Sequence, residues 1–509
     1  MELRELFANA GATVPQEAAA VDVRALAVDS RRVTPGALFA ALPGRDLDGA
    51  QFAAQAVGRG AVAVLAEHDL DAGAPVVIAA NPRRAFSLAS ARFYGEPSRR
   101  LSLFGITGTN GKTTTAYLVE QLSSLRGLGT GLIGTVECTW PGGRLPATHT
   151  TPESHELQAL LRKMLEAGAQ VVAMEVSSHA LSQERAAGCT FAGAAFTNLT
   201  RDHLDYHGTL DRYFDAKATL FRELLPRGAP AVLNFDDPRV AALAKELPDA
   251  LGFTLHGAPG AALFAEQLRS NLDGLRFRLR TGGPLGAQLA EVQSPLLGAH
   301  NAENLLAAIG LLLGSGVPLG EVARVLPEAR GAPGRLERVP DAQGRVVLVD
   351  YAHSPDALAR VLDAVRSAAG QSPRLVCVFG CGGDRDRGKR PLMGEAAAAR
   401  ADLVIATSDN PRTEDPLRIL AEVEPGLARG GKHALDPRHA RAGAEGYCIV
   451  PERREAIELA LRCADRGDAV LIAGKGHEDY QIVGVEKRPF DDRVEARRIL
   501  EALRREDAE

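Results

Sequence analysis

Short runs of consecutive apolar residues recur along the chain, with polar or helix-like stretches between them. Before residue 98 the clearest runs are 61–65 and 76–78, separated by turn-forming residues. From Leu101 onward the runs alternate with helical patterns, and strands are predicted at 171–176, 194–198 and 231–234. This alternation is typical of a largely parallel α/β sheet.

The alternation of strands and helices is interrupted and then resumes in the last third of the chain. A helix is predicted at 301–313, and Gly331-Ala332-Pro333-Gly334 is a probable hinge. Beyond it we expect strands at 346–349, 375–379, 402–406 and 468–473 and a helix at 355–369. These elements predict a doubly wound domain, and the missing Gly-x-Gly-x-x-Gly motif argues against a dinucleotide site. Glu96 to Arg100 is a polar connector, so we place three domains at 1–98, 99–333 and 334–509.

Composition narrows the function classes. A chain of 509 residues with 45% apolar residues fits about three packed domains. Its net charge of −5 argues against a nucleic-acid partner. The sequence shows no secretory signal and no run of 18 apolar residues, so we expect no membrane span. The six scattered cysteines indicate reduced thiols in a cytoplasmic protein, for which a monomer is the working expectation.

The most specific motif follows the apolar run that starts at Leu101. It reads Gly-Ile-Thr-Gly-Thr-Asn-Gly-Lys-Thr-Thr-Thr over residues 105–115 and precedes a helix expected to start near Thr114. Strand, glycine loop and helix form the setting of a phosphate-binding loop. Lys112 would neutralise phosphate charge and the Thr113 hydroxyl would bind Mg²⁺. The candidate nucleotide-binding residues are Gly108, Thr109, Asn110, Gly111, Lys112, Thr113 and Thr114. Ile106 occupies the place of the first glycine of the usual Walker spacing, so this is not the generic loop.

Two strand ends supply candidate metal ligands. Glu175 ends an apolar strand, where a carboxylate is well placed for Mg²⁺. His203 lies in a polar loop that holds two histidines and two aspartates within six positions, and we favour it as a ligand over a structural histidine. Lys217 follows in a helical stretch, and the residues alone favour a solvated lysine there.

Near the second hinge, Asn301 either caps a helix or contacts an adenine. Arg335 either reaches phosphate from a closing domain or forms a structural ion pair.

Three polar loops follow strands of the last domain and should meet at one sheet edge. They are 380–390, 408–415 and 473–478. Their arginines, amides and Glu478 suit a zwitterionic ligand, in which arginine binds a carboxylate and Glu478 an ammonium group. A solvated charged rim is the alternative.

Together these motifs resemble those of the Mur ligases over nearly the whole chain. The similarity rests on the loop at 107–114, Glu175 to His179, 198–207, 300–304, Gly334-Arg335-Leu336-Glu337, Asp350 to His353 and the N-terminal Asp29-Ser30-Arg31 and Asp48-Gly49. The resemblance implies a small α/β uridine-nucleotide domain, a central P-loop parallel-sheet ATPase domain and a C-terminal doubly wound Rossmann-like domain. It also implies ATP and Mg²⁺, with UDP-N-acetylmuramoyl-dipeptide as acceptor of an amino acid.

The resemblance carries roles to matching positions. Lys217 would be carbamylated and, with Lys112 and His203, catalytic; Thr113, Glu175, His203 and Lys217 would hold metal. Asn301 and Arg335 would contact ATP, and Ser30 uridine. The sugar-peptide would contact Thr150, Thr151, Ser177, Gln183 and Arg185. Asp409-Asn410-Pro411-Arg412, with Gly474 and Glu478, is similar to the pocket of members that add meso-diaminopimelate. Of Arg385, Arg387 and Arg390, we choose Arg385 as the partner of Arg412.

The implied chemistry is activation of a carboxylate as an acyl phosphate, followed by attack of an amine. A folylpolyglutamate synthetase would share the loop but lack the Asn-Pro-Arg pocket and the uridine-type domain. A nucleotide-gated binding protein without ligase activity is the alternative from another class, and phosphate release that needs both substrates would separate the two.

Overall fold

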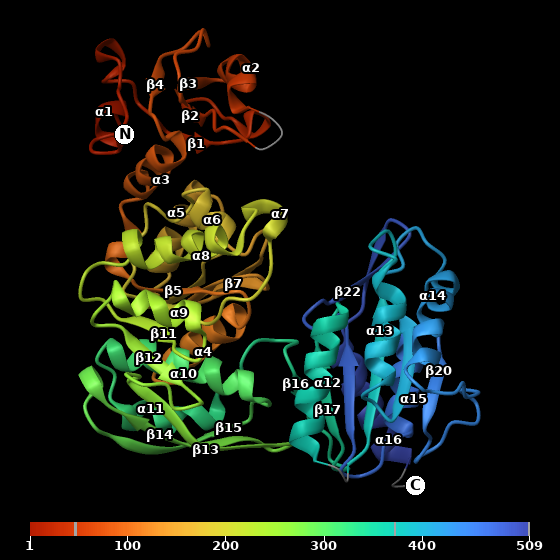
Figure 1. The fold of residues 1–509 in the computed structure, drawn as a ribbon. Coiled ribbons are helices and arrows are strands. Elements are labelled where there is room, and N and C mark those ends of the chain that lie inside the picture. The colour runs from red at the N-terminus through yellow and green to blue at the C-terminus, as the bar shows by residue number, and fades with distance from the viewer. Residues whose placement is uncertain (45–47, 371–372, 507–509) are drawn as a thin grey trace. The chain divides into compact units, whose positions relative to one another are not determined.

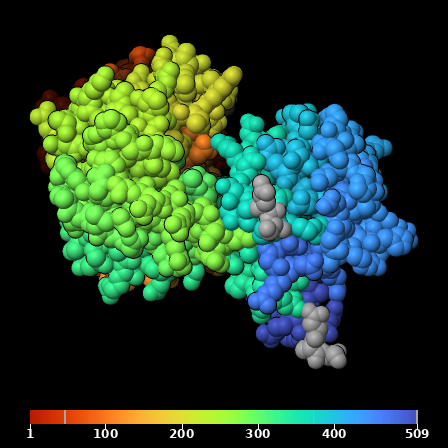
Figure 2. Space-filling model, turned by 60° about the horizontal axis from the view of Figure 1, so that its bottom comes forward, coloured from red at the N-terminus to blue at the C-terminus, as the bar shows by residue number. Residues whose placement is uncertain are grey.

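The computed structural model describes residues 1–44, 48–370 and 373–506. Contacts between residues divide the chain into two compact units (Figure 1). Unit 1 comprises 1–265, 279–290 and 303–325, and unit 2 comprises 266–278, 291–302 and 326–509. Figure 2 shows the packed surface of the central part of the chain in yellow and green and that of the C-terminal part in cyan to blue.

The amino-terminal part is a small parallel sheet covered by helices. Its strand order is β1-β2-β3-β4, and all neighbouring strands are parallel. The strands are β1 (Ala25–Ala27), β2 (Ala37–Ala40), β3 (Ala61–Ala66) and β4 (Val76–Ile78), and the helices are α1 (Leu3–Leu6), α2 (Ala53–Gly58) and α3 (Pro82–Phe93). Both strands predicted here are therefore confirmed. Leu38, Leu65 and Phe86 pack in its core, so the apolar runs became strands because they are buried on both faces.

The central sheet has eleven strands in the order β15-β14-β13-β12-β11-β10-β5-β9-β6-β7-β8. The strands from β12 to β6 in that order are parallel, whereas β7 and β8 are antiparallel additions at one edge. The bounds are β5 (Ser102–Thr107), β6 (Thr130–Ile133), β7 (Glu137–Trp140), β8 (Gly143–Pro146), β9 (Val171–Glu175), β10 (Gly193–Phe196), β11 (Ala231–Asn234), β12 (Leu251–Thr254), β13 (Leu263–Asn271), β14 (Gly274–Thr281) and β15 (Leu289–Ser294).

Strand β5 lies between β9 and β10, so the carboxyl ends of these three strands are neighbours. That placement brings together the loops that follow Thr107, Glu175 and Phe196. The helices of this part are α4 (Lys112–Ser124), α5 (Ser154–Glu166), α6 (Ser178–Ser182), α7 (Leu204–His207), α8 (Leu210–Thr219), α9 (Pro238–Ala242), α10 (Ala299–Gly314) and α11 (Leu319–Val325). Helix α4 begins at Lys112, two residues before the predicted start, because the turn closes immediately after Gly111.

The carboxyl-terminal sheet has the order β16-β17-β21-β18-β19-β20, and every neighbouring pair is parallel except β16 with β17. Its strands are β16 (Glu337–Val339), β17 (Val346–Asp350), β18 (Leu375–Cys381), β19 (Leu403–Ser408), β20 (Gly446–Ile449) and β21 (Ala469–Ala473). The helices are α12 (Pro355–Ala369), α13 (Lys389–Ala398), α14 (Pro416–Arg429), α15 (Arg453–Arg462) and α16 (Asp492–Glu506), and β22 (Tyr480–Val483) pairs with β23 (Glu486–Pro489). Apolar cores lie on both faces of the sheet, as the doubly wound prediction requires.

All six cysteines are buried and free, in agreement with the expected reduced thiols. Among the described residues, no helix is long and apolar enough to cross a membrane.

Candidate functional site

The phosphate-type loop between β5 and α4 needs glycine at two positions. Gly108 has a φ of 142° and Gly111 a φ of 86°, values that other residues rarely adopt. A Cβ on Gly108 would stand 1.9 Å from the Thr197 hydroxyl oxygen, and one on Gly111 would stand 2.2 Å from the Asn304 amide oxygen. The loop therefore packs directly against the end of β10 and against α10, with no room for a side chain.

Two lysines converge on one carbonyl of this loop. The Gly108 oxygen accepts hydrogen bonds from Lys112 Nζ at 3.0 Å and from Lys217 Nζ at 2.7 Å. Lys217 is buried with 1% of its surface exposed, above the Tyr213 ring at 4.5 Å from its centroid. Burial, and then the charge of Lys112, lower the pKa of Lys217 well below its ordinary value. The residues alone had favoured a solvated lysine, and that interpretation is wrong.

Thr113 and Glu175 form the oxygen-rich part of the site. The Thr113 hydroxyl donates to Glu175 Oε2 at 2.9 Å. The same carboxylate accepts from the Thr135 amide at 2.7 Å and from the Thr135 hydroxyl at 3.1 Å. Glu175 is the last residue of β9, as predicted, and it is buried. Thr135 is a partner that the sequence did not reveal. A carboxylate with neighbouring hydroxyl groups is the kind of ligand set that suits Mg²⁺, so these residues fit that ion.

His203 lies in the loop after β10 and is about half exposed, 3.4 Å from the Asp202 carboxylate. Its ring is 4.9 Å from the His179 ring and 6.1 Å from the Tyr213 ring, measured between centroids. Tyr213 therefore lies next to both His203 and Lys217. Within the described ranges, no three histidine, cysteine, aspartate or glutamate side chains gather as a metal site. The four predicted ligands instead form two pairs, one around Glu175 and one around Tyr213.

The remaining residues of the glycine loop form hydrogen bonds with the loop that follows β10. The Asn110 amide donates to the Asn198 side-chain oxygen at 2.9 Å, and the Thr109 hydroxyl donates to the Thr200 carbonyl at 3.2 Å. Thr114 is buried in the first turn of α4. These bonds hold the loop from the side of the neighbouring strand.

The residues assigned to the sugar-peptide lie close to Glu175. The Thr151 hydroxyl donates to the Glu175 carbonyl at 2.8 Å and accepts from the Ser177 amide at 3.1 Å. Arg185 donates to the Thr151 carbonyl at 3.0 Å and to the Gln183 side-chain oxygen at 2.7 Å.

Thr150, the remaining member of this set, lies 3.1 Å from the Thr135 hydroxyl. Ser30, in the amino-terminal part, is buried and donates to Gln55 at 2.7 Å.

Asn301 and Arg335 both belong to unit 2. Asn301 lies inside the first turn of α10 and donates to the Leu297 carbonyl at 2.8 Å, so it does not cap the helix. Asn304, three residues further on, contacts the loop helix, since its amide oxygen accepts from the Thr115 hydroxyl at 3.4 Å.

The Arg335 guanidinium lies over the Tyr351 ring, 4.8 Å from its centroid. Among the described residues its buried Nε has no hydrogen-bond partner, and this arrangement does not match the structural ion pair considered as the alternative. Burial and then the Arg335 charge lower the pKa of the neighbouring His477 to about 4.

The loops after β19 and β21 meet around a buried cation. Lys475 is fully buried, and its Nζ contacts Glu478 Oε2 at 3.1 Å, Asn410 Oδ1 at 3.3 Å and Asp409 Oδ1 at 3.6 Å. Asn410 also donates to Glu478 at 3.0 Å. Lys475 was not predicted, because only Gly474 and Glu478 of this loop match the diaminopimelate pocket of the Mur ligases. Its position between two glycines directly after a strand was the available signal.

The predicted carboxylate-binding arginine, Arg412, lies in the same loop after β19. Arg412 Nη1 donates to the Gly383 carbonyl at 2.8 Å, and its backbone has a left-handed φ of 52°. A Cβ on Gly382 would stand 3.0 Å from Arg412 Nη1 and 3.8 Å from Arg385 Cγ, so both arginines lie against that glycine. Gly474 has a φ of 115° at the end of the neighbouring strand β21. The three loops therefore meet at one sheet edge, as predicted.

The other two arginines form ion pairs elsewhere. Arg390 is fully buried and pairs with Glu414 and Glu422, both at 2.7 Å. Arg387 pairs with Glu422. Arg385 donates to the Asp384 carbonyl at 3.3 Å and, among the described residues, forms no ion pair within the protein. This favours Arg385 as the partner of Arg412.

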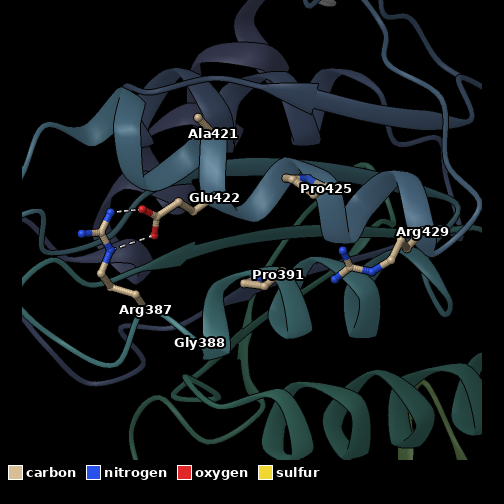
Figure 3. A pocket seen from close by; sticks show the side chains of 7 residues that line it. All are labelled: Arg387, Gly388, Pro391, Ala421, Glu422, Pro425 and Arg429. Carbon is tan, nitrogen blue, oxygen red and sulfur yellow. Dashed lines mark hydrogen bonds and ion pairs between the residues drawn. The ribbon is translucent and has the colours of Figure 1, made fainter.

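A surface hollow of about 540 Å³ lies between α13 and α14 (Figure 3). It is lined by Arg387, Gly388, Pro391, Ala421, Glu422, Pro425 and Arg429. Of the described residues that we predicted to bind substrate or metal, none lines it.

Three domain families that match this chain are all Mur ligase families. Residues 22–96 match the family described as Mur ligase family, catalytic domain; 106–312 match the Mur ligase middle domain; and 334–476 match the Mur ligase, glutamate ligase domain.

Two relatives are named UDP-N-acetylmuramoyl-L-alanyl-D-glutamate--2,6-diaminopimelate ligase. The one from Synechococcus sp. (strain WH7803) is 48% identical over 98% of each chain, and the one from Geobacillus kaustophilus (strain HTA426) is 46% identical over 94% of each.

A solved structure of a ligase with the same name is 36% identical, covers 95% of each chain and superposes with a TM-score of 0.71. The fold is thus the three-domain Mur ligase fold, with N-terminal, central ATPase and C-terminal domains. The chain belongs to the Mur ligase family.

Proposed function

We propose that this chain is the ATP-dependent ligase that adds meso-diaminopimelate to UDP-N-acetylmuramoyl-L-alanyl-D-glutamate in peptidoglycan precursor synthesis. The observation that carries the proposal is 48% identity over 98% of both chains to a relative named for that reaction. The residues at the two sites have the chemistry that the reaction needs.

The first step activates a carboxylate. A carboxylate resists attack by an amine, so the γ-phosphoryl group of ATP is transferred to a carboxylate oxygen of the glutamyl residue, which gives an acyl phosphate and ADP. The Lys112 ammonium and the amides of the glycine loop stabilise the charge on the phosphoryl group during transfer. The loop residues Gly108 to Thr114, with Asn301 and Arg335, bind the nucleotide in this proposal.

The metal assignment rests on the two pairs of side chains around Glu175 and Tyr213. Thr113 and Glu175 would hold one Mg²⁺, and His203 with a carbamylated Lys217 a second. Bound Mg²⁺ would neutralise phosphate charge. Carbamylation suits Lys217, because two ammonium groups on the Gly108 carbonyl repel each other, whereas a carbamate beside Lys112 attracts it.

The second step forms the amide bond. The amine of the incoming amino acid attacks the acyl carbon, the carbon–oxygen bond to phosphate breaks, and the amine loses a proton. The protein contributes position and exclusion of water rather than a nucleophile. Thr150, Thr151, Ser177, Gln183 and Arg185 would orient the sugar-peptide, and Ser30 would contact uridine.

The amino-acid site is assigned to unit 2. Arg412 and Arg385 would bind the carboxylate on the far carbon of diaminopimelate, and Asp409, Asn410 and Glu478 its ammonium group, next to Gly474. Lys475 already occupies one oxygen of Glu478, which leaves the other for substrate.

The three domains would divide at 98/99 and 333/334, with UDP-sugar, ATP and amino acid bound by the first, second and third. We propose a cytoplasmic enzyme that acts as a monomer.

The test is release of inorganic phosphate from ATP by the purified chain. Release should need both UDP-N-acetylmuramoyl-L-alanyl-D-glutamate and an amino acid, and should be fastest with meso-diaminopimelate in a panel that includes L-lysine and L-ornithine. Phosphate release that does not require both substrates would contradict ligase activity. A faster rate with another amino acid would contradict the assignment of meso-diaminopimelate as the substrate.

A further inference from the structure

Glu414, which was not among the predicted ligand residues, connects the two loops that carry Arg385 and Arg412. Glu414 Oε1 accepts from the Asp384 backbone amide at 2.6 Å and from Arg390 Nη2 at 2.7 Å. Its other oxygen accepts from Arg390 Nη1 at 3.0 Å. Arg390 also donates to the Gly382 carbonyl at 3.3 Å, so the loop after β18 is held at two points.

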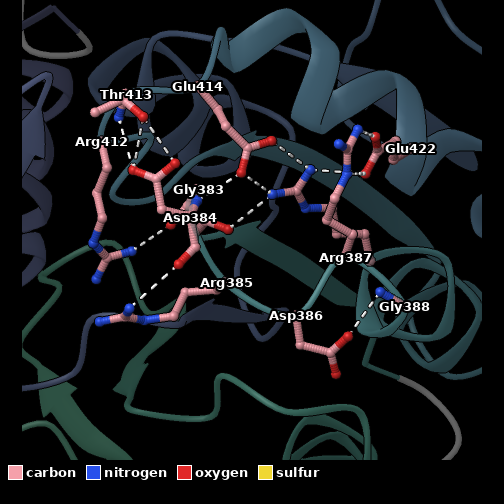
Figure 4. A network of polar contacts seen from close by, with 12 residues as sticks. Gly383, Asp384, Arg385, Asp386, Arg387, Gly388, Arg412, Thr413, Glu414 and Glu422 are labelled. Atoms are coloured by element: carbon pink, nitrogen blue, oxygen red, sulfur yellow. Dashed lines mark hydrogen bonds and ion pairs between the residues drawn. The ribbon is translucent and has the colours of Figure 1, made fainter.

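Asp384 continues the connection back to the residue beside Arg412 (Figure 4). Its carboxylate accepts from the Thr413 amide at 3.1 Å and from the Thr413 hydroxyl at 2.8 Å. Arg412 in turn donates to Gly383 at 2.8 Å. These bonds close a ring in which each loop fixes the backbone of the other.

The ring holds two residues in an unfavourable conformation. Asp384 and Arg412 both have a φ of 52°, a left-handed backbone value that residues other than glycine rarely adopt. Such residues persist only where surrounding contacts determine them. Chiefly through its hydrogen bonds with Arg390, the pKa of Glu414 falls to about 2, so the carboxylate keeps its charge well below neutral pH.

We propose that Glu414 is a positioning residue that sets where the Arg412 guanidinium lies, and through it the discrimination between amino acids with and without a carboxylate on the far carbon. This inference rests on the proposed function. Glu414 itself does not need to touch the substrate.

Glu422 provides a matched control. It pairs with the same buried Arg390 at 2.7 Å and with Arg387. Within the described part of the chain, Glu422 has no hydrogen bond to the backbone of either loop. Loss of its charge removes a similar ion pair while the ring through Asp384 remains.

The experiment compares the wild type with Glu414→Gln and Glu422→Gln, using kcat and KM for meso-diaminopimelate, L-lysine and ATP. In Glu414→Gln the ratio of kcat/KM for diaminopimelate to that for lysine should fall about tenfold or more, mainly through KM for diaminopimelate, because a charge-assisted contact is displaced. KM for ATP should stay within about twofold, and Glu422→Gln should leave the ratio within about threefold.

A second variant guards against a folding defect. Thr413→Val, at an exposed position, removes one hydroxyl donor to Asp384 and should shift the ratio in the same direction by a smaller factor. The inference is overturned if Glu414→Gln leaves the ratio unchanged, or if Glu414→Gln and Glu422→Gln change it equally. A wild-type preference for lysine would contradict the proposed function alone, since the change of the ratio between wild type and variant still tests Glu414.

Discussion

At the scale of single residues, the Gly108 carbonyl accepts hydrogen bonds from two lysines, Lys112 and Lys217. Two cations at one backbone oxygen are unfavourable unless an anion joins them or one loses its charge. Each lysine therefore supports a separate prediction.

Lys112→Ala should lower kcat for phosphate release by about 10²- to 10³-fold, because the phosphoryl group loses one fixed positive charge during transfer. Steady-state kinetics with circular dichroism as the folding control measure this. Full turnover by a folded variant would contradict the role of Lys112.

Lys217→Ala should be inactive and should recover part of its rate with added acetate or propionate, which replace the carboxylate-like oxygens of a carbamate. The same anions should not rescue Lys112→Ala, where a cation is missing. An unmodified Lys217 in a substrate-bound crystal structure would count against carbamylation.

The burial of individual charged residues could not be predicted from the sequence. The motifs predicted the loop lysine, Glu175 and the Asp-Asn-Pro-Arg stretch, because each follows a strand end. The burial of Lys217, Lys475 and Arg390 depends on side chains far away in sequence, and a charged residue in a helix or loop is usually exposed. Local pattern carries no information on such contacts.

At the scale of elements, the buried parallel strands were the most predictable parts. Strands such as β11 and β17 are contiguous apolar runs, which is the pattern expected when both faces are covered. Strands β7 and β8 and the pair β22–β23 were not predicted, because they are largely half-buried or exposed and carry mixed polar residues. The pair β22–β23 matters for the site, since the Ile482 amide donates to Asn410 at 2.9 Å.

Two of the ion pairs between helices α15 and α16 differ in burial. Arg453 and Asp492 are both fully buried at 2.6 Å, whereas Arg454, which pairs with Glu495 at 2.7 Å, is half exposed. Asp492→Ala should lower the opening free energy of α16 by about 3–5 kcal/mol, because it leaves a buried guanidinium unpaired. Arg454→Ala should cost less than about 1 kcal/mol.

Native-state hydrogen exchange of the α16 amides in the full chain measures both effects. Equal protection losses in Asp492→Ala and Arg454→Ala would contradict the distinction between the buried and the exposed pair.

At the scale of the whole molecule, the glycine loop lies in unit 1, and the arginines proposed to bind a carboxylate lie in unit 2. The alternation of strands and helices along the chain predicted the central sheet and the carboxyl-terminal sheet. Segments 266–278 and 291–302 belong to unit 2, and this could not be predicted from the sequence. It depends on which surfaces pack together rather than on local periodicity.

The central claim is that this ligase selects meso-diaminopimelate. The far carboxylate should pair with Arg412 through charge-assisted hydrogen bonds worth about 1.5–3 kcal/mol each, and lysine would leave that arginine unpaired beside its own ammonium group.

The most direct measurement is the ratio of kcat/KM for meso-diaminopimelate to that for L-lysine in the wild-type enzyme, with the nucleotide dipeptide and ATP saturating. We expect a ratio of about 10³ or more. A ratio near one, or one that favours lysine, would contradict it.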